Sequence, residues 1–146
     1  MNMKLVSFAV MFASLLLAGC SDGRTAMQKT FENDVLEYTK AVWAGHDMTR
    51  KSAEAAQVAE KKIAELKGRK IEKWICIKRG GTCESINKKF DYHISLYPDQ
   101  YISFDAYEGD KITFTGEITR IDPSIGSGAT VWVVINSKAD AVVTAK

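Results

Sequence analysis

The sequence has little of what marks most enzymes and metal-binding proteins: two histidines, three cysteines and two prolines among 146 residues. Three cysteines are too few for a disulfide framework, and two separated histidines do not make a zinc site. Nucleophile elbows, HExxH motifs and glycine-rich phosphate loops are also missing. The net charge of +2 is too small to indicate general nucleic-acid binding. We therefore expect no catalytic centre, no metal ion or other cofactor, and no nucleic-acid partner.

The composition instead indicates a folded domain. Apolar residues make up 46% of the chain and charged residues 26%, which is typical of a globular protein and not of a disordered one. A chain of 146 residues is long enough to bury a core of its own. We expect one domain with accessory elements.

The amino-terminal residues have the pattern of an export signal. Lys4 is the only charged residue before Asp22, and residues 5–17 (LVSFAVMFASLLL) form a mostly apolar segment. A positive start, a short apolar segment and small residues after it are typical of a secretory signal peptide. A membrane span would need about 20 apolar residues. We therefore expect residues 1–19 to be a signal peptide.

The sequence Leu17-Ala18-Gly19-Cys20 resembles the bacterial lipobox, in which an aliphatic residue and two small residues precede a cysteine. The resemblance implies a lipoprotein whose signal is cut between Gly19 and Cys20 and whose Cys20 carries diacylglycerol and a further acyl chain such as palmitate. Several acyl chains would anchor the protein stably to the membrane lipid. Ser21 implies, in a host with two membranes, an outer-membrane anchor facing the periplasm. The alternative is an uncleaved amino-terminal anchor helix.

The next part of the chain predicts a short tether over residues 20–30 and a helical segment over residues 31–67. Apolar residues recur at helical spacing in the sequence Phe31, Val35, Tyr38 and Val42. Gly45 is expected to end the first helix, and Asp47 to cap a second one.

The second helix, residues 48–66, has only a thin apolar stripe. Modest packing of this helix predicts that the region after residue 68 folds alone. The alternative is that the large apolar residues of the first helix cover an open end of that region, and so belong to its core.

From residue 68 onward, apolar and polar residues alternate with period two, which predicts strands. The alternation favours strands near residues 71–78, 92–97, 101–107, 112–119, 131–135 and 141–144. Five or six short strands are typical of a small closed or partly closed barrel. Gly116, inside one predicted strand, marks a point where a barrel strand can bend. A small sandwich or an open meander is the alternative.

Two stretches resemble bacterial OB-fold domains. They are residues 109–118 (GDKITFTGEI) and residues 66–70 (LKGRK). The resemblance implies an α+β fold, in which an amino-terminal helical segment is followed by an OB-like β-barrel over residues 68–146. It also implies a binding function.

Cys76 and Cys83 flank a Gly-Gly turn, and export would place them in an oxidising compartment. A disulfide between them is therefore expected. Free thiols are one alternative, and a redox pair or a metal site with His93 is another. A redox dithiol normally has two intervening residues and structural zinc needs four ligands, so neither requirement is met.

Charge is unevenly distributed along the predicted strands. Residues 67–89 carry a net charge of +6 and residues 91–122 a net charge of −5. We predict a possible binding surface for an anionic lipid headgroup or an acidic envelope protein, made of Lys73, Trp74, Lys78, Arg79, His93 and Tyr97. The alternative is that the basic and acidic strands pair with each other.

Taken together, these patterns predict a membrane-anchored lipoprotein that acts in the cell envelope as a non-catalytic binding or interaction module. The alternative is an accessory or exclusion lipoprotein of plasmid or phage type, which occupies an envelope component. A small hydrolase or redox protein is the third class, and no motif favours it.

Overall fold

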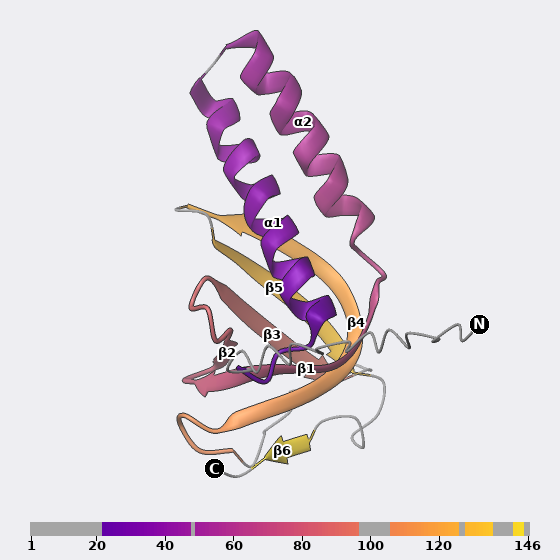
Figure 1. The fold of residues 1–146 in the computed structure, drawn as a ribbon, viewed down its shortest axis with the longest axis vertical. Coiled ribbons are helices and arrows are strands. Elements are labelled where there is room, and N and C mark those ends of the chain that lie inside the picture. Colours follow the sequence, from indigo (N-terminus) through magenta and orange to yellow (C-terminus); the bar gives the residue numbers. More distant parts are fainter. Residues whose placement is uncertain (1–21, 48, 97–105, 126–127, 136–141, 145–146) are drawn as a thin grey trace, which may run out of the picture.

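The computed structural model describes residues 22–47, 49–96, 106–125, 128–135 and 142–144, which form an α+β fold (Figure 1). The helical elements come first: α1 (Ala26–Ala44), the short 3-10 helix η1 (Gly45–Asp47) and α2 (Arg50–Glu65). The strands follow: β1 (Lys70–Arg79), β2 (Thr82–Glu84), β3 (Phe90–Leu96), β4 (Lys111–Ser124), β5 (Gly128–Ile135) and β6 (Val142–Thr144). Most of the strand predicted for residues 101–107 lies outside the described residues.

Each α-helix begins at a threonine whose side chain caps it. The Thr25 side chain accepts a hydrogen bond from the backbone N–H of Gln28, and that of Thr49 accepts one from Ser52. Thr49, and not Asp47 as predicted, therefore caps the second helix. Because α1 already begins at Ala26, the tether expected for residues 20–30 is shorter than predicted.

The two helices form an antiparallel hairpin above the strands (Figure 1). Gly45 ends α1, as expected, and the reason is a close approach between helices. A Cβ atom at this position would lie 2.4 Å from the Cβ of Ala56 in α2. The strands form a ring, and we call the end of α1 next to them the ring end. We call the other end of α1, which lies next to the first turn of α2, the hairpin end.

The helical segment and the strands share one core. Phe31 and Val35 of α1 are fully buried in the same cluster as the strand residues, whereas α2 buries only Ala59 and Ile63. The modest packing expected from the thin apolar stripe therefore applies to α2 alone. Of the two alternatives that the sequence left, the observed one is that the first helix belongs to the core.

Five strands close into a ring in the order β1-β2-β3-β5-β4, with β4 paired back to β1, and β6 adds to β4. β3 and β5 are parallel, and the other pairs are antiparallel. β4 therefore lies beside β1 in the order β4-β1-β2-β3, which is the arrangement of a Greek key.

β4 passes from one pairing partner to the next beside the glycine at which the sequence predicted a bend. Residues 111–117 of β4 pair with β1, and residues 117–124 pair with β5. A Cβ atom at Gly116 would lie 2.4 Å from the backbone oxygen of Val134. Glycine is needed here because a side chain would clash with the backbone of β5 at this point of close contact.

A bulge changes the register of β1. Its pairing with β4 shifts between Ile71 and Trp74, and Lys73 within the bulge has a φ of 53°. Continuous alternation would have placed Ile71 and Trp74 on opposite faces, but both are buried. An extra residue in one strand reverses which side chains point inward.

Candidate functional site

The structure contains the predicted disulfide. Cys76 of β1 and Cys83 of β2 are bonded, with their Cα atoms 5.5 Å apart, and both are buried in the core. The bond links two neighbouring antiparallel strands across the turn at residues 80–81. Its burial gives the pair a structural role.

The predicted binding surface is wrong at Trp74. This side chain is fully buried, with its ring 4.8 Å from that of Phe31 and 6.3 Å from that of Tyr92. The bulge in β1 is the physical reason, because it turns Trp74 into the core. Tyr97, another member of that predicted surface, lies outside the described residues.

The basic members of the predicted surface are partly neutralised by acidic neighbours. Arg79 lies 3.6 Å from the carboxylates of both Glu84 and Glu108. The Lys78 ammonium donates to a backbone carbonyl of the adjacent turn, and Lys73 is exposed on the bulge. Pairing between basic and acidic segments, the alternative that the charge pattern left open, therefore accounts for Arg79.

His93 belongs to a different group of side chains. Its ring stacks on that of Trp132 in β5 with 4.3 Å between centroids, and the guanidinium of Arg120 in β4 lies 5.3 Å from the same indole. Asp122 accepts a hydrogen bond from the indole nitrogen and pairs with Arg120. The Arg120 hydrogen bond lowers the pKa of Asp122 below its ordinary value. These four side chains therefore interact with one another in a row across β3, β5 and β4.

A groove of about 480 Å³ lies between the helical hairpin and the second half of β4. Its lining is mostly apolar, with polar side chains among it: Val42, Trp43, Glu60, Ile63, Ala64, Lys67, Thr119, Arg120, Ile121 and Pro123. The volume falls within the range of about 300–1,000 Å³ that is usual for binding pockets. Lys67 is exposed and forms no ion pair with any described residue. The groove thus combines an apolar floor with an available cation.

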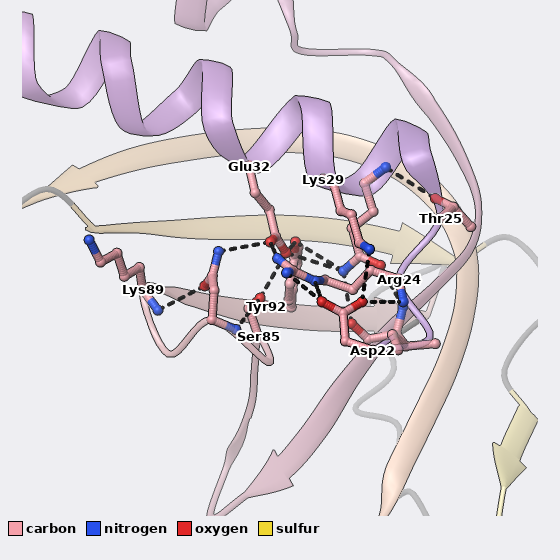
Figure 2. Close-up of polar contacts among 11 residues, drawn as sticks. Asp22, Arg24, Thr25, Lys29, Glu32, Ser85, Lys89 and Tyr92 are labelled. Carbon is pink, nitrogen blue, oxygen red and sulfur yellow. Dashed lines mark hydrogen bonds and ion pairs between the residues drawn. The ribbon is translucent and has the colours of Figure 1, made fainter. Parts of the chain in front are cut away.

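At the ring end of α1, one carboxylate is completely buried. Glu32 projects from α1 toward β3 and the loop after β2 (Figure 2). Its Oε1 accepts hydrogen bonds from the hydroxyls of Tyr92 (2.6 Å) and Ser85 (2.8 Å) and from the amide of Gln28 (3.2 Å). This oxygen therefore connects α1 to β3 and to the loop before it.

The second oxygen of Glu32 connects the same site to the amino-terminal segment. It accepts hydrogen bonds from the amide of Asn87 (2.8 Å) and from the guanidinium of Arg24. Arg24 in turn donates to the carboxylate of Asp22 through Nε (3.0 Å) and Nη2 (2.6 Å), and Lys29 lies 3.4 Å from that carboxylate. A buried charge is tolerated only with such partners, and this one has five donors.

Gln28 joins α1 to β1 directly. Its side-chain amide donates to the backbone oxygen of Ile75 (2.8 Å) and accepts from the backbone N–H of the same residue (3.0 Å). The side chain is fully buried and takes the place of a neighbouring strand beside β1.

The surroundings of the site set the charge states of two of its members. Burial, together with the negative charge of Glu32, raises the pKa of Tyr92 well above its ordinary value, so Tyr92 is neutral and can donate. The hydrogen bond from the Arg24 side chain holds the pKa of Asp22 well below its ordinary value of 3.8. Asp22 is therefore ionised near neutral pH.

The sequence interpretation did not find this polar site, although a signal was present. Gln28, Phe31, Glu32, Val35 and Thr39 recur at helical spacing and are the buried residues of α1. Three polar side chains, Gln28, Glu32 and Thr39, thus interrupt the stripe that faces the core. Such residues need buried partners, but the spacing alone does not say which ones.

Within the described residues, no helix is both long and apolar enough to cross a membrane. In that same part of the chain, no group of three or more His, Cys, Asp and Glu side chains is placed to hold a metal ion. The residues expected to be a signal and a lipid anchor, 1–20, lie outside it. No known protein family matches the chain, and neither a curated protein nor a solved structure does so.

Proposed function

We propose that this protein is a bacterial lipoprotein, anchored in the cell envelope through acylated Cys20 and acting as a non-catalytic binding module. The observation that carries the proposal is the sequence Leu17-Ala18-Gly19-Cys20 directly after a short apolar segment. A cut before Cys20 is compatible with the fold, because it leaves Asp22, Arg24 and all of α1 in the mature protein. Ser21 favours the outer membrane, with the domain in the periplasm.

We further propose that the strand ring is an OB-like barrel. Five strands in a Greek-key order, with β5 placed between β3 and β4, support this assignment. OB-folds bind ligands on their strands and loops, so the topology favours binding over catalysis.

The groove beside the hairpin is the binding site that we propose. Its occupant is an apolar peptide segment of an envelope protein that places an acidic side chain near Lys67. The apolar lining supports the first part of this choice. The exposed ammonium of Lys67, which forms no ion pair with a described residue, supports the second. Clefts with a mostly apolar lining and a few polar groups are the usual binding sites of small domains.

The lipid anchor is tested by intact-mass analysis of the full chain produced in a bacterium with two membranes. The unaltered protein should lack residues 1–19 and carry the added mass of acyl chains. Cys20→Ser should keep its signal and gain no lipid. Ser14→Ala, which changes the signal outside the lipobox, should be processed normally. Normal processing of Cys20→Ser would contradict the proposal.

The groove is tested with a photo-crosslinking residue in place of Glu60, an exposed lining residue whose replacement leaves Lys67 intact, in the membrane-anchored protein. We expect an adduct that protease digestion removes, which identifies a polypeptide. Ala64→Arg, which fills the groove from its lining, should abolish the adduct. Ala55→Arg is the matched control, because Ala55 is an exposed residue of the same helix outside the groove. A purely lipid adduct, or one that survives Ala64→Arg, would exclude this occupant.

A further inference from the structure

The amino-terminal residues of the described domain are held firmly to it. Asp22 accepts hydrogen bonds from the backbone N–H of Arg24 (3.0 Å) and from the Arg24 side chain, while Arg24 also bonds the buried carboxylate of Glu32. We call Asp22, Arg24, Lys29 and Glu32 the latch (Figure 2). The latch ties residues 22–24 to a carboxylate that β3 and the loop after β2 also hold.

Gly23 packs closely on the strands as well. It has a φ of +88°, and a Cβ atom there would lie 2.9 Å from the Cδ1 of Ile75. This contact is independent of the charges in the latch. Residues 22–24 are therefore part of the folded surface and do not act as a flexible tether.

Very little chain separates this surface from the proposed lipid anchor. Only Ser21 stands between Cys20 and Asp22. Two residue steps span at most about 7 Å even when fully extended. If Cys20 is acylated, the ring end of α1 must therefore lie next to the bilayer surface.

The hairpin end lies far from that point. α1 has 19 residues and is therefore about 28 Å long. Figure 1 shows α1 leading from the strand ring to its turn with α2, so the hairpin end projects away from the strands. The groove residues Val42 and Trp43 belong to the hairpin end.

We propose that the latch holds the domain against a lipid bilayer in one preferred orientation, with the ring end of α1 at the membrane and the hairpin end directed into the aqueous compartment. This inference rests on the proposed acylation of Cys20. It assigns the bilayer surface as the partner of the ring end. It also directs Val42 and Trp43, the groove residues at the hairpin end, away from the lipid to which the protein is anchored.

The experiment compares two labelled positions in the acylated protein on vesicles of phosphatidylethanolamine and phosphatidylglycerol. A fluorophore is attached through Met27→Cys near the ring end, or through Lys51→Cys near the hairpin end; both positions are exposed. A nitroxide on the lipid headgroups quenches fluorophores close to the bilayer. We expect several-fold stronger quenching at position 27 than at position 51.

Two changes separate the contribution of the short linkage between Cys20 and Asp22 from the contribution of the latch to this difference in quenching. A flexible Gly-Ser segment inserted between Ser21 and Asp22 lengthens the linkage without altering the fold, and it should make the two positions nearly equal. Arg24→Ala should reduce the difference by releasing residues 22–24, whereas Arg50→Ala, an exposed arginine in α2, should not. If Arg24→Ala does not unfold cooperatively, the partly exposed partner is changed instead, as Asp22→Ala.

The outcomes distinguish this inference from the proposed function. A mature protein without acyl chains would overturn the lipoprotein proposal and the orientation with it. An acylated protein in which both labels are quenched equally would overturn the orientation alone. An unchanged difference in a folded Arg24→Ala or Asp22→Ala protein would show that the latch does not set it.

Discussion

The two ends of α1 are held in the fold by different kinds of contact. At the ring end, Phe31 and Val35 are fully buried, and Glu32 uses both oxygens to accept hydrogen bonds from residues far away in the sequence. At the hairpin end, Trp43 is 36% exposed and lines an open groove.

Along this one helix, the ring end therefore contributes mainly to stability, and the hairpin end contributes to the proposed binding groove. Ring-end side chains of α1 contact both β1 and β3, so a change there disturbs several elements at once. The hairpin end packs mainly on α2, whose buried face is small. Substitutions at the hairpin end can therefore alter the groove at little cost to the fold.

The largest expected effect comes from comparing the two aromatic side chains of α1. Phe31→Ala should lower the free energy of unfolding by about 4 kcal/mol, because it leaves a cavity in a closed core. Trp43→Ala should cost about 1 kcal/mol or less, since that ring is partly exposed. Urea denaturation of both variants measures the difference. Equal losses would show that the hairpin end is as much a part of the core as the ring end.

The next effect concerns the buried carboxylate. Glu32→Gln replaces an acceptor with a donor among groups that already donate, and it leaves Arg24 without its buried partner. We expect a loss of about 3 kcal/mol in the free energy of unfolding. Glu37→Gln, an exposed position of the same helix, is the control and should change stability by less than about 0.5 kcal/mol. If the Glu32→Gln protein were as stable as this control, the carboxylate would not be one of the contacts that stabilise the ring end.

A smaller effect is expected from the disulfide, which stabilises the strands on which the ring end of α1 packs. Cys76 and Cys83 are separated by 7 positions, so the closed loop is short. Replacing both with serine should cost about 2 kcal/mol, chiefly through the greater freedom of the unfolded chain. Thermal melts with and without reductant measure this loss. The reductant should have no effect on the double variant, and a melting temperature unaltered by either treatment would contradict the prediction.

The smallest effect is a dependence on pH at the latch. Because the pKa of Asp22 in the fold is below its ordinary value of 3.8, ionised Asp22 stabilises the fold above that pH. This contribution should disappear as the pH falls below about 4 toward the folded-state pKa. The stability difference between the unaltered protein and Asp22→Asn should therefore shrink on acidification, as urea midpoints at each pH would measure. A difference that is constant with pH would mean that Asp22 contributes through packing and not through its charge.

Much of the fold followed from local patterns. The spacing of Phe31 and Val35 predicted a buried helix face, and Gly116 lies, as a glycine inside a strand suggests, where another backbone approaches closely. The Cys76–Cys83 disulfide was expected from the Gly-Gly turn between the cysteines and from the export that the sequence predicts. Trp74 was misplaced because strand alternation assumes constant register, which the bulge at Lys73 interrupts.

The candidate sites were harder to predict than the elements that carry them. Gln28 and Glu32 had the right helical spacing, but their polar character did not reveal their partners. The basic residues of β1 were grouped by sequence, whereas Arg79 turned toward acidic neighbours and His93 toward Trp132. The groove combines residues from α1, α2 and β4, and no local pattern connects them.

Helix spacing and glycine turns could be recognised from the sequence because each depends on residues within a few positions of one another. The partners of Glu32 depend on distance in space instead. Ser85 and Tyr92 lie 53 and 60 positions away from it in the chain. They meet it only because the ring brings β3 and the loop after β2 beneath α1, where a buried carboxylate is stable when donors surround it. Packing therefore decides which side chains become the site, and this can be established only from the folded molecule.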